Sequence, residues 1–272
     1  MRILVVVVVA MSFRGSRGLQ QHLELLASQG WRDVKPATRE AVAAIESYQL
    51  RHPTSTIAVA GRCAYGYPQA VVMNPNARPR GFGAHLVRLT CPHLCQHIDE
   101  WEKDGAVKSQ SAALLPACAQ SLDQVNARHA ATRRALVSPT TAERAEAELG
   151  RKQFDAAMNS GIAGLSPTRN DDIKCVHAHV ADHLLSGDND IGRRLLRRLQ
   201  DDRACDPEGS SVCHQQCSGQ GPWAYLPAKN KQKLWKTRER RKALRKHLRE
   251  KRRLSSESEG QGQGEALPQP AS

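Results

Sequence analysis

A run of cysteine and histidine residues that begins at Cys175 offers the densest set of metal ligands in the sequence. His177 and His179 follow Cys175 at every second position, and His183 lies four residues further on. If the run is helical, at about 100° per residue, Cys175, His179 and His183 lie within roughly 80° on one face. His177 then points elsewhere, unless it belongs to an irregular first turn. Thiolates and imidazoles are typical ligands of Zn²⁺.

Two other segments carry thiols that a fold can bring to this run. Cys91 lies at a predicted junction between a strand and a helix, with His93 and Cys95 close behind it, and Cys63 lies in a predicted loop. A zinc site built from these segments is chemically reasonable, because Zn²⁺ takes four such ligands in tetrahedral geometry. The alternative is that the same cysteines and histidines are buried structural residues, which is a common position for a cysteine without a disulfide partner.

A thiol-dependent enzyme is a third interpretation of the same residues. Cys175 or Cys91 would be the nucleophile and His177 the base, since a reactive thiolate needs an adjacent imidazole. The segment from Gly161 to Gly164 is not a phosphate-binding signature and is more typical of a turn with positive φ. Cys205, Cys213, His214 and Cys217 match no standard zinc spacing, so this segment is expected to be an ordinary loop.

The composition limits the class of protein. The chain has 272 residues, of which 40% are apolar and only 4% aromatic, so aliphatic side chains must build the core. No apolar run approaches the ~20 residues that span a bilayer. Its eight cysteines are too sparse for a small disulfide scaffold. An intracellular, cytoplasmic protein with reduced thiols is expected, with nuclear or organellar targeting as alternatives.

Most of the net charge of +13 lies in one segment near the C-terminus. Lys229–Arg253 contains fourteen Lys or Arg and two Glu, while the remaining residues are nearly neutral together. The segment is expected to be helical when supported, and otherwise a solvated extension. Its functional interpretations are weak electrostatic contact with nucleic acid or an anionic membrane surface, or a nuclear-import signal. A protein that binds RNA or another partner through this segment is therefore a further hypothesis.

Hydrophobic patterning predicts an α+β protein: a small antiparallel sheet packed with several helices, and a disordered basic C-terminal tail. Pro36 is expected to open one helix, and Asp171 or Asp172 to cap another. Strands are expected at 56–60, 70–73 and 85–90, and helices at 19–28, 36–50, 92–101, in two segments between 107 and 158, and at 173–185 and 191–199.

The expected organisation has three parts. Residues 1–54 form an N-terminal extension with short helices, 55–205 the core domain, and 206–272 an irregular linker, a basic helix and a disordered tail. The apolar run within Met1–Met11 suits either a buried strand or the hydrophobic part of a targeting segment.

Four stretches, taken together, resemble the bacterial domain-of-unknown-function family 501, whose genes are often labelled as neighbours of septum-formation initiators. The order and separation of the stretches also agree, over about residues 55–200. One departure is Ala64, where family members usually have proline. The stretches are Arg62-Cys63-Ala64-Tyr65-Gly66-Tyr67-Pro68-Gln69, Leu89-Thr90-Cys91-Pro92-His93-Leu94, Gly161-Ile162-Ala163-Gly164, and Lys174-Cys175-Val176-His177-Ala178-His179 with its continuation Gly187-Asp188-Asn189-Asp190-Ile191-Gly192.

The resemblance implies that Cys63, Cys91, Cys175, His177 and His179 form one spatial site. For a zinc site, we predict Cys63, Cys91 and Cys175 as thiolate ligands and His177 as the fourth ligand, with His179 as its substitute. The resemblance implies no reaction, because the family has no established one. The leading hypothesis is therefore an uncharacterised protein whose core holds a Cys/His centre of the zinc type, with the thiol enzyme and the partner-binding protein as alternatives.

Overall fold

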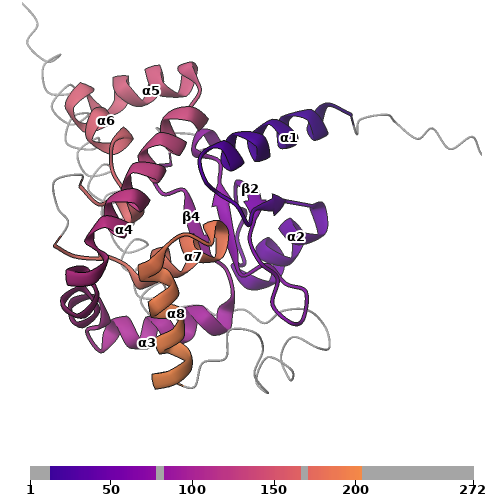
Figure 1. Ribbon diagram of the computed structural model, residues 1–272. Helices are drawn as coiled ribbons and strands as arrows, with labels where there is room; N and C mark the ends of the chain where they lie inside the picture. Colours follow the sequence, from indigo (N-terminus) through magenta and orange to yellow (C-terminus); the bar gives the residue numbers. More distant parts are fainter. Residues whose placement is uncertain (1–12, 78–82, 167–170, 204–272) are drawn as a thin grey trace, which may run out of the picture. The chain divides into compact units, whose positions relative to one another are not determined.

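A four-stranded antiparallel sheet forms the centre of the fold in the computed structural model, which describes residues 13–77, 83–166 and 171–203 (Figure 1). The strands lie in the order of the sequence: β1 (Lys35–Pro36), β2 (Thr56–Val59), β3 (Ala70–Met73) and β4 (Val87–Leu89). The sheet and the surrounding helices confirm the predicted α+β class.

Both faces of the sheet are covered, since successive side chains of a strand point to opposite faces. Val71 of β3 packs with Val59 and with Ile45 on one face, beneath α2 (Arg39–Ala44) and the π-helical turn η1 (Ile45–Gln49). Ala70 and Val72 point to the other face and join the main core, which includes Val180 of α7 (Val176–Ser186).

The remaining helices surround this sheet. Trp31, which follows the first helix, is fully buried, and its indole N–H donates to Thr132 Oγ1 of the long fourth helix at 2.8 Å. The helices are α1 (Phe13–Ser28), α3 (Pro92–Lys103), α4 (Ala106–Leu136), α5 (Pro139–Leu149), α6 (Arg151–Met158) and α8 (Asp190–Arg203), with short 3₁₀ turns η2 (Pro75–Ala77) and η3 (Ile162–Gly164).

Three predicted helix boundaries are wrong. Pro36 lies in β1, and α2 begins only after Thr38, whose hydroxyl accepts the N–H of Ala41 as an N-cap. The helix expected from Ile173 begins at Val176, because Lys174 adopts a left-handed conformation with φ 58°. Gly150, with φ 77°, divides the second predicted helix after Pro139 into α5 and α6.

Helices α7 and α8 form a tight hairpin at the C-terminal end of the described core. Gly187 ends α7 with φ 69°, a conformation that glycine adopts readily. A Cβ atom at Gly192 would lie 2.1 Å from the carbonyl oxygen of His179, so only glycine allows the two backbones to approach this closely.

Several predictions lie outside the described residues: the apolar run at Met1–Met11, the late cysteine cluster, and the basic segment Lys229–Arg253. Within the described part of the chain, none of the helices combines the length and the apolar character that crossing a membrane requires.

Candidate metal centre

The end of α3 and the start of α7 meet through a hydrogen bond that caps α7. Cys175 is the N-cap residue of α7, but its side chain does not cap the helix. Instead, Glu102 in the last turn of α3 accepts the N–H of Val176 on its Oε1 atom at 2.8 Å. A carboxylate is favourable at a helix N-terminus, where N–H groups lack partners within the helix.

The backbone before Cys175 directs the thiol toward this carboxylate. Lys174 has φ 58°, which is uncommon for a residue with a side chain, and its ammonium group donates to the Gly164 carbonyl at 2.8 Å. Cys175 itself is extended, with φ −157°. Its thiol therefore lies beside α7 rather than on a helical face.

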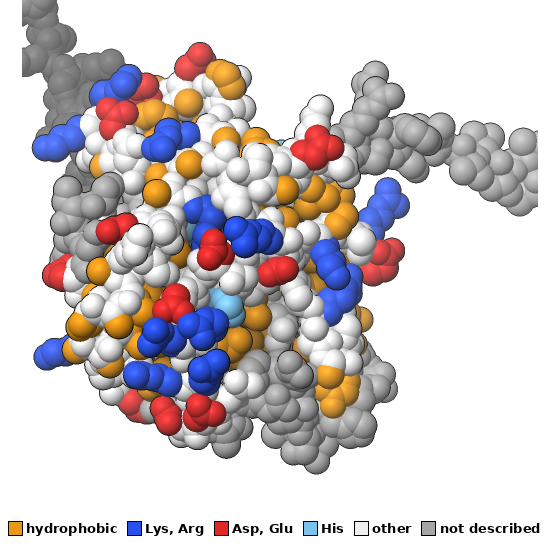
Figure 2. All heavy atoms as spheres, viewed as in Figure 1, with side chains coloured by type: hydrophobic (Ala, Val, Ile, Leu, Met, Phe, Trp, Pro, Cys, Tyr) orange, Lys and Arg blue, Asp and Glu red, His pale blue; other side chains and the backbone are white. Residues whose placement is uncertain are grey.

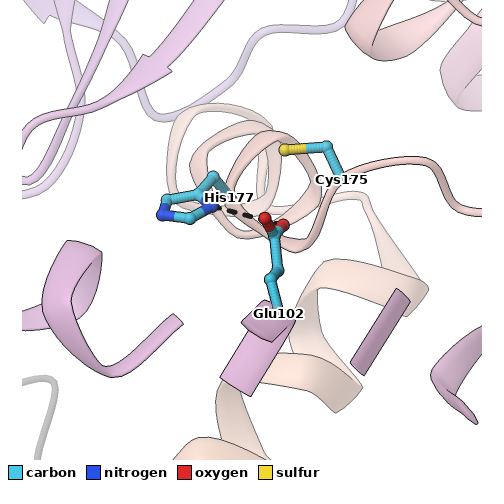
Figure 3. Close-up of side chains that lie close together, drawn as sticks. All are labelled: Glu102, Cys175 and His177. Carbon is cyan, nitrogen blue, oxygen red and sulfur yellow. Dashed lines mark ion pairs between the residues drawn. The ribbon is translucent and has the colours of Figure 1, made fainter. Parts of the chain in front are cut away.

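Three potential ligands converge at this junction (Figure 3): Glu102, Cys175 and His177. One ligand atom from each, the carboxylate oxygen, the sulfur and an imidazole nitrogen, lies within 4.8 Å of the other two. His177 Nδ1 is 3.3 Å from Glu102 Oε1. The side chains of Glu102 and His177 are 18% and 22% exposed, so the group is accessible from solvent.

The electrostatics of the group are dominated by its anions. Burial alone would lower the pKa of His177, but hydrogen bonds and charge interactions with Cys175 and Glu102 raise it to about 10. Burial alone would raise the pKa of Glu102, but the His177 hydrogen bond and charge lower it. Without a metal, His177 is therefore an imidazolium held between acidic groups at neutral pH.

Two further side chains of α3, Asp99 and Cys95, lie close to the group of three. Asp99 Oδ1 is 3.5 Å from His177 Nε2, and Asp99 Oδ2 is buried without a hydrogen-bond partner among the described residues. Burial, followed by the nearby Cys91, Asp99 and Cys175, raises the pKa of the Cys95 thiol. Cys95 is therefore a protonated thiol at neutral pH, and it donates to the Leu89 carbonyl at 3.7 Å.

The part of the sequence that matches a known protein family contains the two segments that carry the three converging residues. A family described as "Protein of unknown function (DUF501)" matches residues 59–197, just over half of the chain. The chain belongs to the DUF501 family. No curated protein and no solved structure matches it. The matched DUF501 region includes α3, the start of α7, and therefore all three converging residues.

Two of the predicted site residues, Cys63 and Cys91, are not members of this group of three. Cys63 is in the loop between β2 and β3, where it is half-buried and its N–H donates to the Tyr67 carbonyl at 3.0 Å. Cys91 is buried as the N-cap of α3, and its N–H donates to the Gln69 carbonyl. Among the described residues, neither joins the group in which the ligand atoms are within 4.8 Å.

His179, the predicted substitute for His177, belongs to a buried polar network instead. Its Nδ1 atom lies 3.2 Å from Asn189 Nδ2, which also donates to Asp182 Oδ2 at 2.9 Å. Asp182 is fully buried and accepts from Arg128 at 2.7 Å and from His129 at 2.8 Å. Burial lowers the pKa of His179 to about 4, so the ring is neutral.

Glu102 is the residue that the sequence analysis did not identify. Its signal is the spacing of Cys91, Cys95, Asp99 and Glu102, which at about 100° per residue lie within roughly 80° on one face of a helix. A stripe of thiols and carboxylates on one helix face is unusual for a solvated surface. It faces the beginning of α7, where Cys175 and His177 lie.

Proposed function

We propose that this DUF501 chain holds a divalent transition metal of the zinc type between α3 and α7. Cys175 Sγ, His177 Nδ1 and one oxygen of Glu102 would be its ligands. The observation that carries the proposal is the convergence of these three atoms within 4.8 Å, from segments more than seventy residues apart in the sequence. Thiolate, imidazole and carboxylate are all ligands that Zn²⁺ accepts.

The charge of the site supports a cation. Glu102 and Asp99 both face the imidazole of His177, and Cys175 would add a thiolate ligand on binding a metal. A bound cation would replace the proton of His177 and offset these charges, because metal binding requires a deprotonated imidazole and thiolate.

Asp99 supports the proposal as an outer partner of the imidazole. A histidine that binds zinc through one ring nitrogen commonly donates the other N–H to a carboxylate, which fixes the orientation of the ring. With Nδ1 directed at the ligand group, His177 Nε2 faces Asp99 at 3.5 Å. The chain thus supplies the orienting group as well as the ligands.

Three protein ligands leave one tetrahedral position for another molecule. Among the residues that the structure describes, no fourth Cys, His, Asp or Glu joins the three within the same distance. Zinc with three protein ligands and an open position typically polarises a bound water or a carbonyl group. We therefore infer a reactive centre rather than a purely structural one.

Metal substitution with cobalt tests the proposal directly. Full-length protein, stripped with a chelator and titrated with Co²⁺, should bind one equivalent and show thiolate-to-cobalt absorption in the near ultraviolet. Cys175→Ser should lose that absorption, whereas Cys63→Ser, which removes another half-buried thiol, should keep it. Absence of cobalt–thiolate absorption in the folded wild-type chain would overturn the proposal.

A thiol-dependent enzyme is the second candidate, and one contact favours it. The Cys175 sulfur lies within 4.8 Å of a ring nitrogen of His177, and a thiol beside an imidazole is the arrangement that thiol-dependent enzymes use. Alkylation separates the two candidates: Cys175 in chelator-treated protein should react faster than Cys63, and saturating Zn²⁺ should suppress that reaction if the metal proposal holds. Rapid alkylation that Zn²⁺ does not change would favour the enzyme.

A further inference from the structure

A tight turn lies immediately before Cys175, one of the proposed metal ligands. The Cys175 N–H donates to the Ile173 carbonyl, two residues earlier, at 2.6 Å, and Lys174 between them has φ 58°. A three-residue turn with this hydrogen bond and a positive φ at its centre is the rare, strained form of the γ-turn. Lysine gains nothing from positive φ, which is uncommon for residues other than glycine. The strain at Lys174 therefore points to a role for the turn itself.

Contacts with two helices hold both ends of the turn. Before it, Ile173 is fully buried, and its N–H donates to Ser111 Oγ of α4 at 3.0 Å. After it, Val176 is fully buried, and its N–H donates to Glu102 Oε1 of α3 at 2.8 Å. A strained backbone conformation persists only where the surrounding structure determines it. Here the protein itself supplies that constraint, through α3 and α4.

A second strained segment contacts the turn. Ala163, in η3, has φ 52°, and the carbonyl of the next residue, Gly164, accepts a hydrogen bond from the Lys174 ammonium group at 2.8 Å. Within the described part of the chain, three residues other than glycine have positive φ, and two of them, Ala163 and Lys174, belong to the segments that this contact joins. The third is Arg51, which follows η1. Strained residues cluster at functional sites, so the pair supports a functional role for the turn.

The turn sets the direction of the Cys175 thiol. Because α7 begins only at Val176, Cys175 is extended, with φ −157°, and its sulfur lies within 4.8 Å of ligand atoms of Glu102 and His177. A helix that began one turn earlier would place Cys175 on the face that carries His179 instead. The convergence of the three proposed ligands therefore depends on the backbone just before the helix.

We infer that Lys174 is a positioning residue of the proposed metal centre, whose strained turn holds the Cys175 thiol in the ligand position before a metal binds. The inference rests on the proposed function, because the turn acts through Cys175 as a ligand. A ligand group that is held in place beforehand loses less conformational freedom on binding, which strengthens the affinity. Releasing the turn should therefore weaken metal binding even where the chain stays folded.

Two substitutions of Lys174 separate the backbone from the ammonium group, because both remove the ammonium. Lys174→Gly favours positive φ, so the dissociation constant for Co²⁺ should stay within about threefold of the wild-type value. Lys174→Val opposes positive φ through its branched Cβ, so that constant should increase at least about tenfold, and the thiolate-to-cobalt absorption should weaken. Titration of the full-length, chelator-treated chain with Co²⁺ measures both quantities.

Arg51→Val is the matched control, since Arg51 is an exposed residue with φ 54° outside the proposed centre. Both valine variants should be less stable in urea denaturation, but only Lys174→Val should lose cobalt affinity. Hydrogen exchange without metal links that loss to the turn. The Cys175 N–H should exchange slowly in the wild type and in Lys174→Gly, and rapidly in Lys174→Val.

Equal cobalt affinities of Lys174→Gly and Lys174→Val, or an equal loss of affinity in Arg51→Val, would overturn the inference and leave the metal proposal intact. Rapid exchange of the Cys175 N–H in the wild-type chain would also overturn it, and this measurement remains decisive if Lys174→Val does not fold. Absence of cobalt–thiolate absorption in the folded wild-type chain would overturn the metal proposal, and the inference with it.

Discussion

Two histidines of α7 that are only two residues apart have opposite electrostatic environments. His177, at the start of the helix, is partly exposed and lies between the carboxylates of Asp99 and Glu102, and its pKa is raised to about 10. His179, one half-turn later, is completely buried, and its pKa is lowered to about 4. Burial opposes the charged form of both rings. At His177, the interactions with Cys175 and Glu102 outweigh burial, whereas at His179 the nearby Asp182 charge does not.

The comparison teaches which polar cluster is built to bind and which is built to hold the fold together. Both carboxylate oxygens of the buried Asp182 accept hydrogen bonds, from Arg128, His129 and Asn189, although Arg128 Nε and His179 Nε2 are buried without a partner among the described residues. Around His177, one carboxylate oxygen of Asp99 is buried without a partner among the described residues, and the carboxylates of Asp99 and Glu102 both lie beside the imidazole. The Asp182 carboxylate is therefore fully used within the fold, whereas the Asp99 carboxylate keeps an oxygen without a partner beside the proposed metal ligands.

Removing the Asp182 carboxylate should have the largest effect. Asp182→Ala leaves the Arg128 guanidinium buried without its partner, and breaking a buried ion pair in this way typically costs about 3–5 kcal/mol. Urea denaturation should show that loss in the free energy of unfolding. The folded fraction should still bind one equivalent of Co²⁺, and a variant that loses cobalt absorption without losing stability would reverse the roles assigned to the two clusters.

Removing the Asp99 carboxylate should have a smaller effect, and it should change the metal affinity rather than the stability. Asp99→Asn should weaken zinc affinity by about 10- to 100-fold, the range found for outer partners of metal-binding histidines. The free energy of unfolding without metal should change less than in Asp182→Ala, since the Asp99 and His177 side chains are each 22% exposed. Competition with a chromogenic chelator measures the affinity, and Asp123→Asn on α4 is the matched control. Equal zinc affinities for the two variants would contradict an orienting role for Asp99.

The smallest expected effect is the contribution of His129 to the pH dependence of stability. Burial lowers the pKa of His129 below its ordinary value despite its hydrogen bond to Asp182, so the folded state binds this proton less readily than the unfolded chain. The resulting stability is present above about pH 6.5 and is lost as the pH falls below it. Melting temperatures of chelator-treated protein should therefore decrease between pH 7 and pH 5.5, and His129→Gln should show a smaller decrease. If the melting temperatures of both proteins decreased equally, the pH dependence would come from titratable groups other than His129.

The sequence predicted the elements more reliably than it predicted which residues meet. The bounds of β3 agree with the prediction, because a run of aliphatic residues between turn-forming segments is a local signal. The family resemblance is confirmed by the match over residues 59–197. Residues 13–54 also contribute to the main core through Leu26 and Trp31, a long-range contact that no local pattern predicts.

The site shows why ligands are difficult to select from spacing alone. The helical-face argument grouped Cys175 with His179, but Cys175 has extended backbone angles and lies outside the helical periodicity. Because of this extended backbone at Cys175, its thiol lies close to His177 rather than on the face that carries His179. Glu102 resembled an ordinary polar residue of an amphipathic helix, and only the packing of α3 against α7 makes it a neighbour of Cys175. Whether Cys63 and Cys91 bind metal stays a prediction.

Glu102 has two duties: it accepts the first N–H of α7 and it is a candidate metal ligand. Two separate requirements therefore limit substitution at this position, one for folding and one for metal binding. Two selections can distinguish them. A library selected only for folded protein should retain glutamine at position 102, whose amide oxygen still accepts the Val176 N–H, and deplete alanine. Selection for metal occupancy should then remove glutamine as well.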